Sequence, residues 1–317
     1  MLKAVYSPGC LREFDTRRIL YAFHDIDGTH SLIRNWPPVM SIVLADVIKR
    51  GLPDDFDSEA NLIRLINAAG TRPLPETDKF CVESAGLSAL TQMEWAIRRA
   101  VEAGTVSVKA DPDINSKKVR LIWEGVEKFP DMPETDEMQA MLSEYTPRLF
   151  KLYERVLNGY CRDKNLALAR ANPESFRVKG SFEFLTRLYN AGVKNYFVTG
   201  AVVERGKGMF EEVETLGYPI GAGCMVEDII GSTWDTKLPK DEIMLTLLAR
   251  LHTDGASVLV TGDGRSEISA GISMGALTLS RLNTGAERQK QLHTQLGTHI
   301  MVADFTDPLL SRVFITE

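Results

Sequence analysis

The sequence predicts an α/β protein built on a doubly wound parallel sheet, with an all-helical segment inserted into it. Short apolar runs at 19–23, 196–198 and 257–260 have the length and composition of central strands covered on both faces. After Pro173 such runs alternate with stretches of helical periodicity, which is typical of parallel sheets. Residues 31–174 instead show helical spacing and few convincing strands. The two patterns therefore indicate two structural parts in one chain.

The inserted stretch is expected to form a series of helices. Met40 to Ile48 have helical spacing that Gly51 ends, and Ser58 is a suitable N-cap for a helix that reaches Gly70. We expect two further helices, one that contains residues 87–97 and ends at 104, and one at about 134–170 that Pro147 interrupts; segments 71–75 and 110–118 have the composition of connectors.

The part after Pro173 is expected to alternate between helices and strands. We expect helices at about 182–189, 203–216 and 241–252, and strands at 196–198, near 224–226, at 257–260, at 276–279 and at 300–302. The strand at 196–198 should end in Thr199 and Gly200, and the strand at 257–260 in a Thr-Gly-Asp-Gly turn. Ligands bind at the carboxyl ends of strands in such sheets, so these ends are the place to look for chemistry.

Composition excludes several classes of protein. The chain has 317 residues and a net charge of −6, with no dense Lys/Arg run, so neither nucleic acid nor an anionic membrane surface is an expected partner. Its apolar stretches are far shorter than the roughly 20 residues of a membrane helix. The four cysteines lie far apart, which predicts reduced, buried thiols in a cytoplasmic protein rather than a zinc site or disulfides. A monomer and a homodimer both remain open.

Four acidic residues are expected to converge at the strand ends. Asp25 and Asp27 follow the first strand, Asp263 follows the strand at 257–260, and Glu267 comes one turn later. Each pair of carboxylates at 4 Å costs about 1 kcal/mol in water-like surroundings and about 4 kcal/mol at an effective dielectric of 20. A cation must offset this repulsion, and a set of oxygen ligands without His or Cys favours Mg²⁺.

Four segments together resemble the haloacid dehalogenase-like superfamily of phosphohydrolases. They are FHDIDGT at 23–29, YFVTG at 196–200, DTKLPKDEIM at 235–244 and VLVTGDGRSEIS at 258–269. Their order and spacing agree with that family, and the resemblance covers about 20–30 and 175–305. It implies a discontinuous catalytic core of residues 1–30 and 175–317, and an all-helical cap of residues 31–174 inserted between the first two motifs.

The resemblance implies a role for each motif residue. Asp25 would attack phosphorus and form an aspartyl-phosphate, and Asp27 would act as general acid and then base. Gly28 would let the chain turn away from the site, and Thr199 with the Gly200 amide would hold phosphate oxygens. The metal ligands would be Asp25, the Asp27 backbone carbonyl and Asp263, with Glu267 in or near the shell.

Two lysines compete to neutralise the phosphoryl group. Lys240 precedes Asp-Glu-Ile-Met, and Lys237 lies in an alternative Lys-x-Pro-x-Asp arrangement. The spacing to Gly262 favours Lys240.

Several positions depart from the family pattern. His30 stands where the family often has an apolar residue, and we expect a partly exposed loop histidine, with a substrate contact as the sharper alternative. His24 is expected to pack beside the nucleophile. Glu267 replaces the more usual Asp and is one methylene longer, so contact with the metal through water is an alternative. Arg34 is expected to be a solvated surface side chain, with contact to an anionic substrate as the alternative.

The expected activity is that of a Mg²⁺-dependent phosphatase acting on a small phosphorylated metabolite, such as a sugar phosphate. Dehalogenase and phosphonatase relatives lack an acid at the position of Asp27, so this residue points to phosphoryl chemistry on an oxygen ester. An insert as large as 31–174 favours a small substrate, because such caps exclude water from the site. A sugar phosphomutase with the same residues and a non-catalytic phosphometabolite-binding protein remain alternatives.

Overall fold

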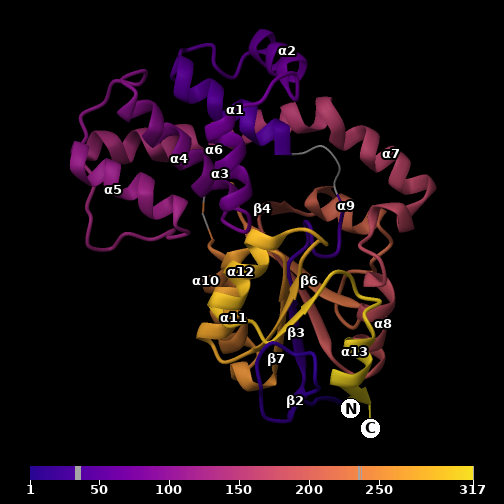
Figure 1. The fold of residues 1–317 in the computed structure, drawn as a ribbon. Coiled ribbons are helices and arrows are strands. Elements are labelled where there is room, and N and C mark those ends of the chain that lie inside the picture. Colours follow the sequence, from indigo (N-terminus) through magenta and orange to yellow (C-terminus); the bar gives the residue numbers. More distant parts are fainter. Residues whose placement is uncertain (33–36, 235, 237, 317) are drawn as a thin grey trace. The chain divides into compact units, whose positions relative to one another are not determined.

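The computed structural model describes residues 1–32, 37–234, 236 and 238–316, and divides the chain into two compact units (Figure 1). The sheet unit comprises Met1–Ile33, Leu166–Thr233 and Leu238–Glu317. The helical unit comprises Arg34–Asn165 and Trp234–Lys237. The assignment of a catalytic core and a cap to such parts stays a prediction.

The sheet unit contains a parallel sheet. Its strands are β3 (Tyr21–His24), β4 (Lys194–Glu204), β6 (Val226–Ser232), β7 (Val258–Gly262), β8 (Leu277–Arg281) and β9 (Ile300–Val302). The order is β6-β4-β3-β7-β8-β9 with every pair parallel, and β5 (Lys207–Gly208) adds a short antiparallel pair to β4. Strand β3 lies between β4 and β7, so the carboxyl ends of these three strands are neighbours, which confirms the predicted doubly wound fold.

Helices cover both faces of this sheet (Figure 1). On one face, α10 (Lys240–Arg250) and α11 (Arg265–Ser273) pack against side chains that include Phe23 and Val260. On the other face lie α8 (Ser181–Asn190), α9 (Met209–Thr215) and α13 (Pro308–Val313). Successive residues of a strand point to opposite faces. His24, which follows Phe23, therefore points toward the face of α8 and α9. Helix α12 (Glu287–Leu296) precedes β9.

The chain termini form a small antiparallel sheet that the sequence analysis did not predict. Its order is β10 (Phe314–Thr316), β1 (Leu2–Ala4) and β2 (Arg17–Ile19). The apolar run at 19–23 is consequently divided between two strands, because Ile19 ends β2 and Tyr21 begins β3. One continuous strand was expected there, and pairing of Leu2 with Ile19 is the tertiary contact that divides the run.

The helical unit contains α1 (Pro37–Arg50), α2 (Glu59–Ala68), α3 (Pro75–Glu83), α4 (Ala89–Glu102), α5 (Pro112–Trp123) and α6 (Asp136–Leu157). The Ser58 side chain accepts a bond from the Asn61 N–H, which confirms the predicted N-cap. No strand occurs among described residues 37–165. No helix in the described stretches of the chain is both long and apolar enough to span a membrane.

Two expectations for the helical unit were wrong. Segment 110–118 was expected to be a connector, but α5 begins at Pro112 because the Asp111 carboxylate caps it and proline suits the first turn. Pro147 was expected to interrupt a helix, but α6 continues through it, held by the buried Leu149 and Phe150. The irregularity comes later, as a π-turn at η1 (Asn158–Arg162) before α7 (Asp163–Ala171).

Strand β4 is longer than expected. Its parallel register with β6 is regular from Tyr196 to Val198 and resumes at Val202, so Thr199 and Gly200 lie at an irregularity rather than at the strand end. The chain then turns through β5, and α9 begins at Met209 rather than near 203. Strand β6 likewise begins at Val226, later than the strand expected near 224–226. All four cysteines are free, with Cys81 and Cys161 buried and Cys10 and Cys224 half-buried, not uniformly buried as expected.

Candidate active site

The loop after β3 carries the first two acidic residues. Strand pairing places His24 opposite Thr261, and the Asp25 N–H donates to the Thr261 carbonyl at 2.9 Å. Asp25 is 4% exposed. Asp263 follows β7 directly, so the strand pairing brings these two carboxylates to the same edge of the sheet. Three carboxylates meet there.

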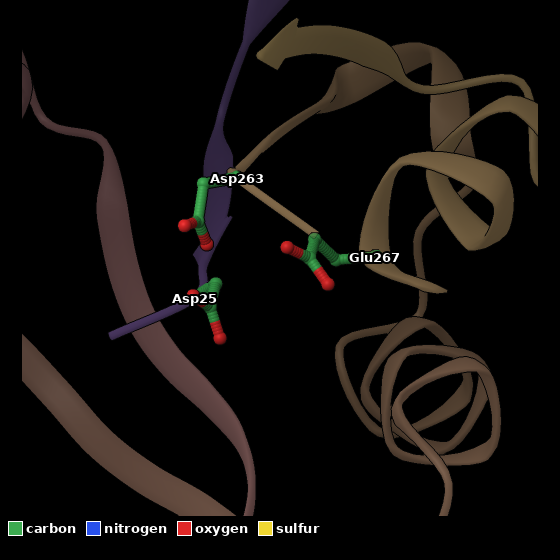
Figure 2. Close-up of side chains that lie close together, drawn as sticks. All are labelled: Asp25, Asp263 and Glu267. Atoms are coloured by element: carbon green, nitrogen blue, oxygen red, sulfur yellow. The ribbon is translucent and has the colours of Figure 1, made fainter. Parts of the chain in front are cut away.

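Asp25, Asp263 and Glu267 each offer one oxygen, and these three atoms lie within 4.8 Å of one another. Figure 2 shows the Glu267 carboxylate turned toward the other two. Glu267 reaches them from the first turn of α11 and is fully buried. Asp27 is outside this three-residue group and is half-buried.

Lys240 brings a positive charge to the cluster. It is the first residue of α10 and only 2% exposed. Its Nζ lies 2.5 Å from Asp25 Oδ1 and 3.0 Å from Glu267 Oε2. The alternative lysine, Lys237, lies outside the described residues, as does Arg34. Lys240 thus contacts the carboxylate of Asp25, and the choice between Lys240 and Lys237 for the phosphoryl group stays a prediction.

The charges shift one another's protonation. Burial, with repulsion from Glu267 and Asp27, raises the pKa of Asp25 to about 7, although Lys240 opposes this. Burial and the Asp25 charge raise the pKa of Asp263 well above its usual range. Burial would raise the pKa of Glu267 too, but Lys240 and backbone N–H bonds hold it below its usual value. The pKa of Lys240 is raised by its carboxylate partners despite burial.

The cluster has the properties of a divalent cation site. Three carboxylates meet here and the Lys240 ammonium contacts two of them, Asp25 and Glu267, which leaves an excess of carboxylates. The donors are all oxygen, the ligand type that Mg²⁺ prefers. Two glycines make the room: a Cβ at Gly28, which has φ +80°, would lie 2.1 Å from Asp263 Oδ2, and a Cβ at Gly262 would lie 2.1 Å from Glu267 Cγ. The residues present therefore fit a bound Mg²⁺.

The predicted phosphate-binding pair lies on the neighbouring strand. Thr199 is 3% exposed, and its hydroxyl accepts a bond from the Ala201 N–H at 3.1 Å. The pairing of His24 with Phe197 places Thr199 and Gly200 on the strand beside the Asp25 loop. Their contact with phosphate remains a prediction.

Three residues around the cluster were missed by the sequence analysis. The Thr29 hydroxyl lies 3.1 Å from Asp25 Oδ2 and 3.4 Å from Asp263 Oδ1, and Ser266 donates to Glu267 Oε2 at 3.0 Å. Arg281 Nη1, at the end of β8, donates to the Gly28 carbonyl at 2.8 Å. Thr29 belongs to the first motif and could have been found there. A charged residue that ends an apolar strand was the available signal for Arg281.

His30 differs from both expectations, since it is neither a partly exposed loop residue nor open to substrate. It is fully buried, with Nε2 3.1 Å from His24 Nδ1 and Nδ1 2.6 Å from Ser181 Oγ. Its position on the inner side of the loop explains the burial, because the ring stacks on Phe305. Burial lowers the pKa of His24 to about 4 and that of His30 well below 6.5.

Comparison with known proteins yields similarity in structure without similarity in sequence. No family model and no curated protein matches the chain. A phosphonoacetaldehyde hydrolase-like protein from Oleispira antarctica superposes with a TM-score of 0.51 at 14% identity, over 97% of this chain and 94% of that one.

Two further solved structures are similar over most of the chain. A predicted phosphatase from Clostridium acetobutylicum has a TM-score of 0.49 at 12% identity, over 93% of this chain and 98% of that one. A β-phosphoglucomutase from Clostridium difficile has a TM-score of 0.47 at 13% identity, over 90% and 92%. Both scores are below 0.5, so the comparison of folds depends on the Oleispira protein.

Proposed function

We propose that this chain, which has the haloacid dehalogenase-like fold, is a Mg²⁺-dependent phosphatase that hydrolyses a small phosphate monoester through an aspartyl-phosphate. One observation carries the proposal: the buried Lys240 ammonium lies 2.5 Å from Asp25 within a cluster that has an excess of carboxylates. A cation and a phosphoryl group together suit such a site, since each offsets charge that the protein leaves unbalanced.

The metal would be held by Asp25, the Asp27 carbonyl, Asp263 and Glu267. Bound Mg²⁺ supplies positive charge that stabilises the phosphoryl oxygens as negative charge develops on them. The Lys240 ammonium would stabilise the same negative charge. Thr199 and the Gly200 amide would hold the phosphate oxygens.

The reaction would proceed in two displacements. In the first, an Asp25 oxygen bonds to phosphorus while the bond from phosphorus to the ester oxygen breaks, and Asp27 donates a proton to that leaving oxygen. In the second, Asp27 takes a proton from water, the water oxygen bonds to phosphorus, and the bond to Asp25 breaks. Inorganic phosphate leaves, and both aspartates return to their starting protonation states.

The substrate would be a small phosphorylated metabolite. Asp27 supports an oxygen leaving group, because a departing alkoxide needs a proton. The large helical insert supports a small substrate, because lids of this kind exclude water from a compact ligand.

Phosphate release from an aryl phosphate in the presence of Mg²⁺ tests the proposal. Asp25→Asn should lower turnover by at least about 10³-fold, because the nucleophile is lost. Asp254→Asn is the matched control: Asp254 is exposed, caps η3 (Gly255–Ser257) through its side chain, and should keep full activity as Asn. Normal turnover by Asp25→Asn would exclude Asp25 as the nucleophile.

The same assay distinguishes the alternatives. A phosphomutase would convert one sugar phosphate to its isomer with little release of inorganic phosphate. A non-catalytic protein would bind phosphorylated metabolites and release phosphate from none across a broad panel.

A further inference from the structure

A chain of buried polar side chains runs beneath the loop that carries Asp25 and Asp27. From one end to the other its members are Tyr218, Ser181, His30, His24 and Asn195. Successive polar atoms are 2.6, 2.6, 3.1 and 3.1 Å apart. Tyr218 is 2% exposed and the other four are fully buried. The proposed chemistry uses none of these side chains.

The partner at the Asn195 end determines which atom donates along the chain. Asn195 Nδ2 donates to the Met225 carbonyl at 2.9 Å, so Asn195 Oδ1 is the acceptor for His24, and His24 Nε2 carries a hydrogen. In a neutral ring His24 Nδ1 is then an acceptor, and His30 Nε2 must donate to it.

The remaining links continue in the same direction. His30 Nδ1 has no hydrogen left, so it accepts from the Ser181 hydroxyl. Ser181 Oγ in turn accepts from the Tyr218 hydroxyl. Both imidazoles are thereby held as the Nε2–H tautomer. The single Tyr218 hydroxyl hydrogen has a second acceptor in reach, the His30 carbonyl at 3.3 Å, which is farther than Ser181 Oγ at 2.6 Å.

The two histidines flank the catalytic loop in the sequence and join its ends in space. His24 is the last residue of β3, and His30 follows Thr29, so their bond closes residues 25–29 at the base. The loop backbone is tight as well, since the N–H groups of Thr29, His30 and Ser31 converge on the Ile26 carbonyl. The His30 carbonyl also accepts from Val178 N at 3.1 Å, which fastens the loop to the segment before α8.

Stability by itself does not account for a buried polar pair at this place. Exchanging both partners of a buried hydrogen bond for apolar groups of the same shape is often nearly neutral. What a fully satisfied polar chain adds is a single defined geometry. Here that geometry is imposed on the loop whose first residue must approach phosphorus within a narrow distance, where a shift of about 1 Å costs on the order of 10² in rate.

We propose that His24 and His30 are positioning residues for the Asp25 nucleophile, and that their hydrogen bond fixes the loop in the geometry of attack. This inference rests on the proposed function, because it assigns a role toward the Asp25 carboxylate. Neither imidazole touches substrate, so the effect is on the rate of the chemical step rather than on binding.

Kinetics of matched variants test the catalytic part. His30→Phe should lower kcat by about 10- to 100-fold with little change in KM, as expected when the nucleophile is displaced. His30→Gln offers an amide donor and a carbonyl acceptor and should recover part of the loss. The control is His299→Phe, which removes another buried imidazole of the sheet unit and should leave kcat unchanged. His299 immediately precedes β9 and bonds to Thr278 of β8. Equal kcat in His30→Phe and wild type, or equal losses in His30→Phe and His299→Phe, would overturn the proposal.

Two measurements do not depend on turnover. Nitrogen-15 NMR of the imidazoles in the wild type should show His24 and His30 as neutral Nε2–H tautomers, and an Nδ1–H form of either would contradict the chain. Amide exchange of residues 26–31 should accelerate in His30→Phe and not in His299→Phe; equal protection of the loop would also refute the proposal. If His30→Phe does not fold, His24→Phe/His30→Phe replaces both partners of the bond and takes its place. If the wild type releases no phosphate, the proposed function is overturned. The NMR and exchange measurements still decide whether the bond between His24 and His30 fixes the loop.

Discussion

The protein buries charge in both of its compact units, but with a different balance in each. In the helical unit, Arg98 and Lys118 are 1% and 3% exposed. Arg98 Nη2 lies 2.8 Å from Glu94 and 2.7 Å from Glu134, and Lys118 also contacts Glu134. Two cations there meet two carboxylates, and Asn115 accepts a further bond from Arg98 at 3.2 Å. This cluster is balanced by the protein itself.

In the sheet unit, the ammonium of Lys240 meets Asp25 and Glu267, with Asp263 beside them. Burial, with repulsion from Glu267 and Asp27, raises the pKa of Asp25 to about 7 although Lys240 opposes this shift. A balanced cluster needs nothing further, whereas an unbalanced one has a place for a ligand charge. The comparison teaches that surplus charge, rather than buried charge as such, distinguishes a site from a structural network.

Arg98→Met should give the largest change in stability. Breaking one side of a buried ion pair costs about 3 to 5 kcal/mol, because the partner carboxylates stay buried without compensation. We expect this loss in urea unfolding, with kcat of the folded protein nearly unchanged. A fall in kcat as large as the one expected below for Lys240→Met would mean that the helical-unit cluster also serves catalysis. It would contradict the distinction between a structural cluster and a site.

Lys240→Met should affect activity most clearly. Loss of a preorganised group that stabilises developing charge costs about 10²- to 10³-fold in kcat. The measurement is phosphate release at saturating Mg²⁺, with Arg98→Met as the control that loses a buried cation elsewhere. Activity within a few-fold of wild type would show that the Lys240 charge is dispensable.

Added Mg²⁺ should stabilise the sheet unit. At about one hundred times its Kd, a ligand that binds the folded state alone adds about 2.7 kcal/mol to the free energy of unfolding. Thermal unfolding of the wild type and of Arg98→Met should shift upward with Mg²⁺, while Asp263→Asn should shift much less. An equal shift in all three would place the metal elsewhere.

With Mg²⁺ at saturation, which keeps the Asp25 and Asp263 carboxylates ionised and so removes the opposing effect of their raised pKa values, mild acid should destabilise the sheet unit rather than the helical unit. All five histidines lie outside residues 34–165. The folded pKa of His24 is about 4, lowered by burial from 6.5, so its stabilising contribution is full above pH 6.5 and is lost as the pH falls toward 4. At pH 5 the loss is about 2 kcal/mol for His24.

Amide exchange at pH 7.5 and pH 5, both at saturating Mg²⁺, checks this expectation. Strands β3 and β4 should lose protection at the lower pH while α4 and α6 keep theirs. His24→Phe should remove part of the difference, since Phe does not titrate. Uniform loss of protection in both units would contradict a histidine origin.

Much of the sheet and of the acidic cluster was determined by the sequence itself. Apolar runs predicted β3, β4 and β7, and because parallel strands end at one edge, Asp25 and Asp263 had to be neighbours. The first-turn position of Glu267 followed from the motif, whereas the choice of Lys240 over Lys237 stays a prediction. The inferences about the strands and the acidic residues succeeded because strand order and strand ends are encoded locally, in short sequence patterns that can be recognised without knowledge of the packing.

Only the tertiary structure decided the contacts between distant segments. The division of the first apolar run at Leu20 depends on pairing with the N-terminal strand, and the continuity of α6 past Pro147 depends on its buried face. The burial of His30 and its bond to Ser181, 151 residues away, depend on how α8 packs against the loop. Hydrogen-bond partners and burial are properties of the packed whole, so a local pattern can indicate which residues do chemistry but not what holds them in place.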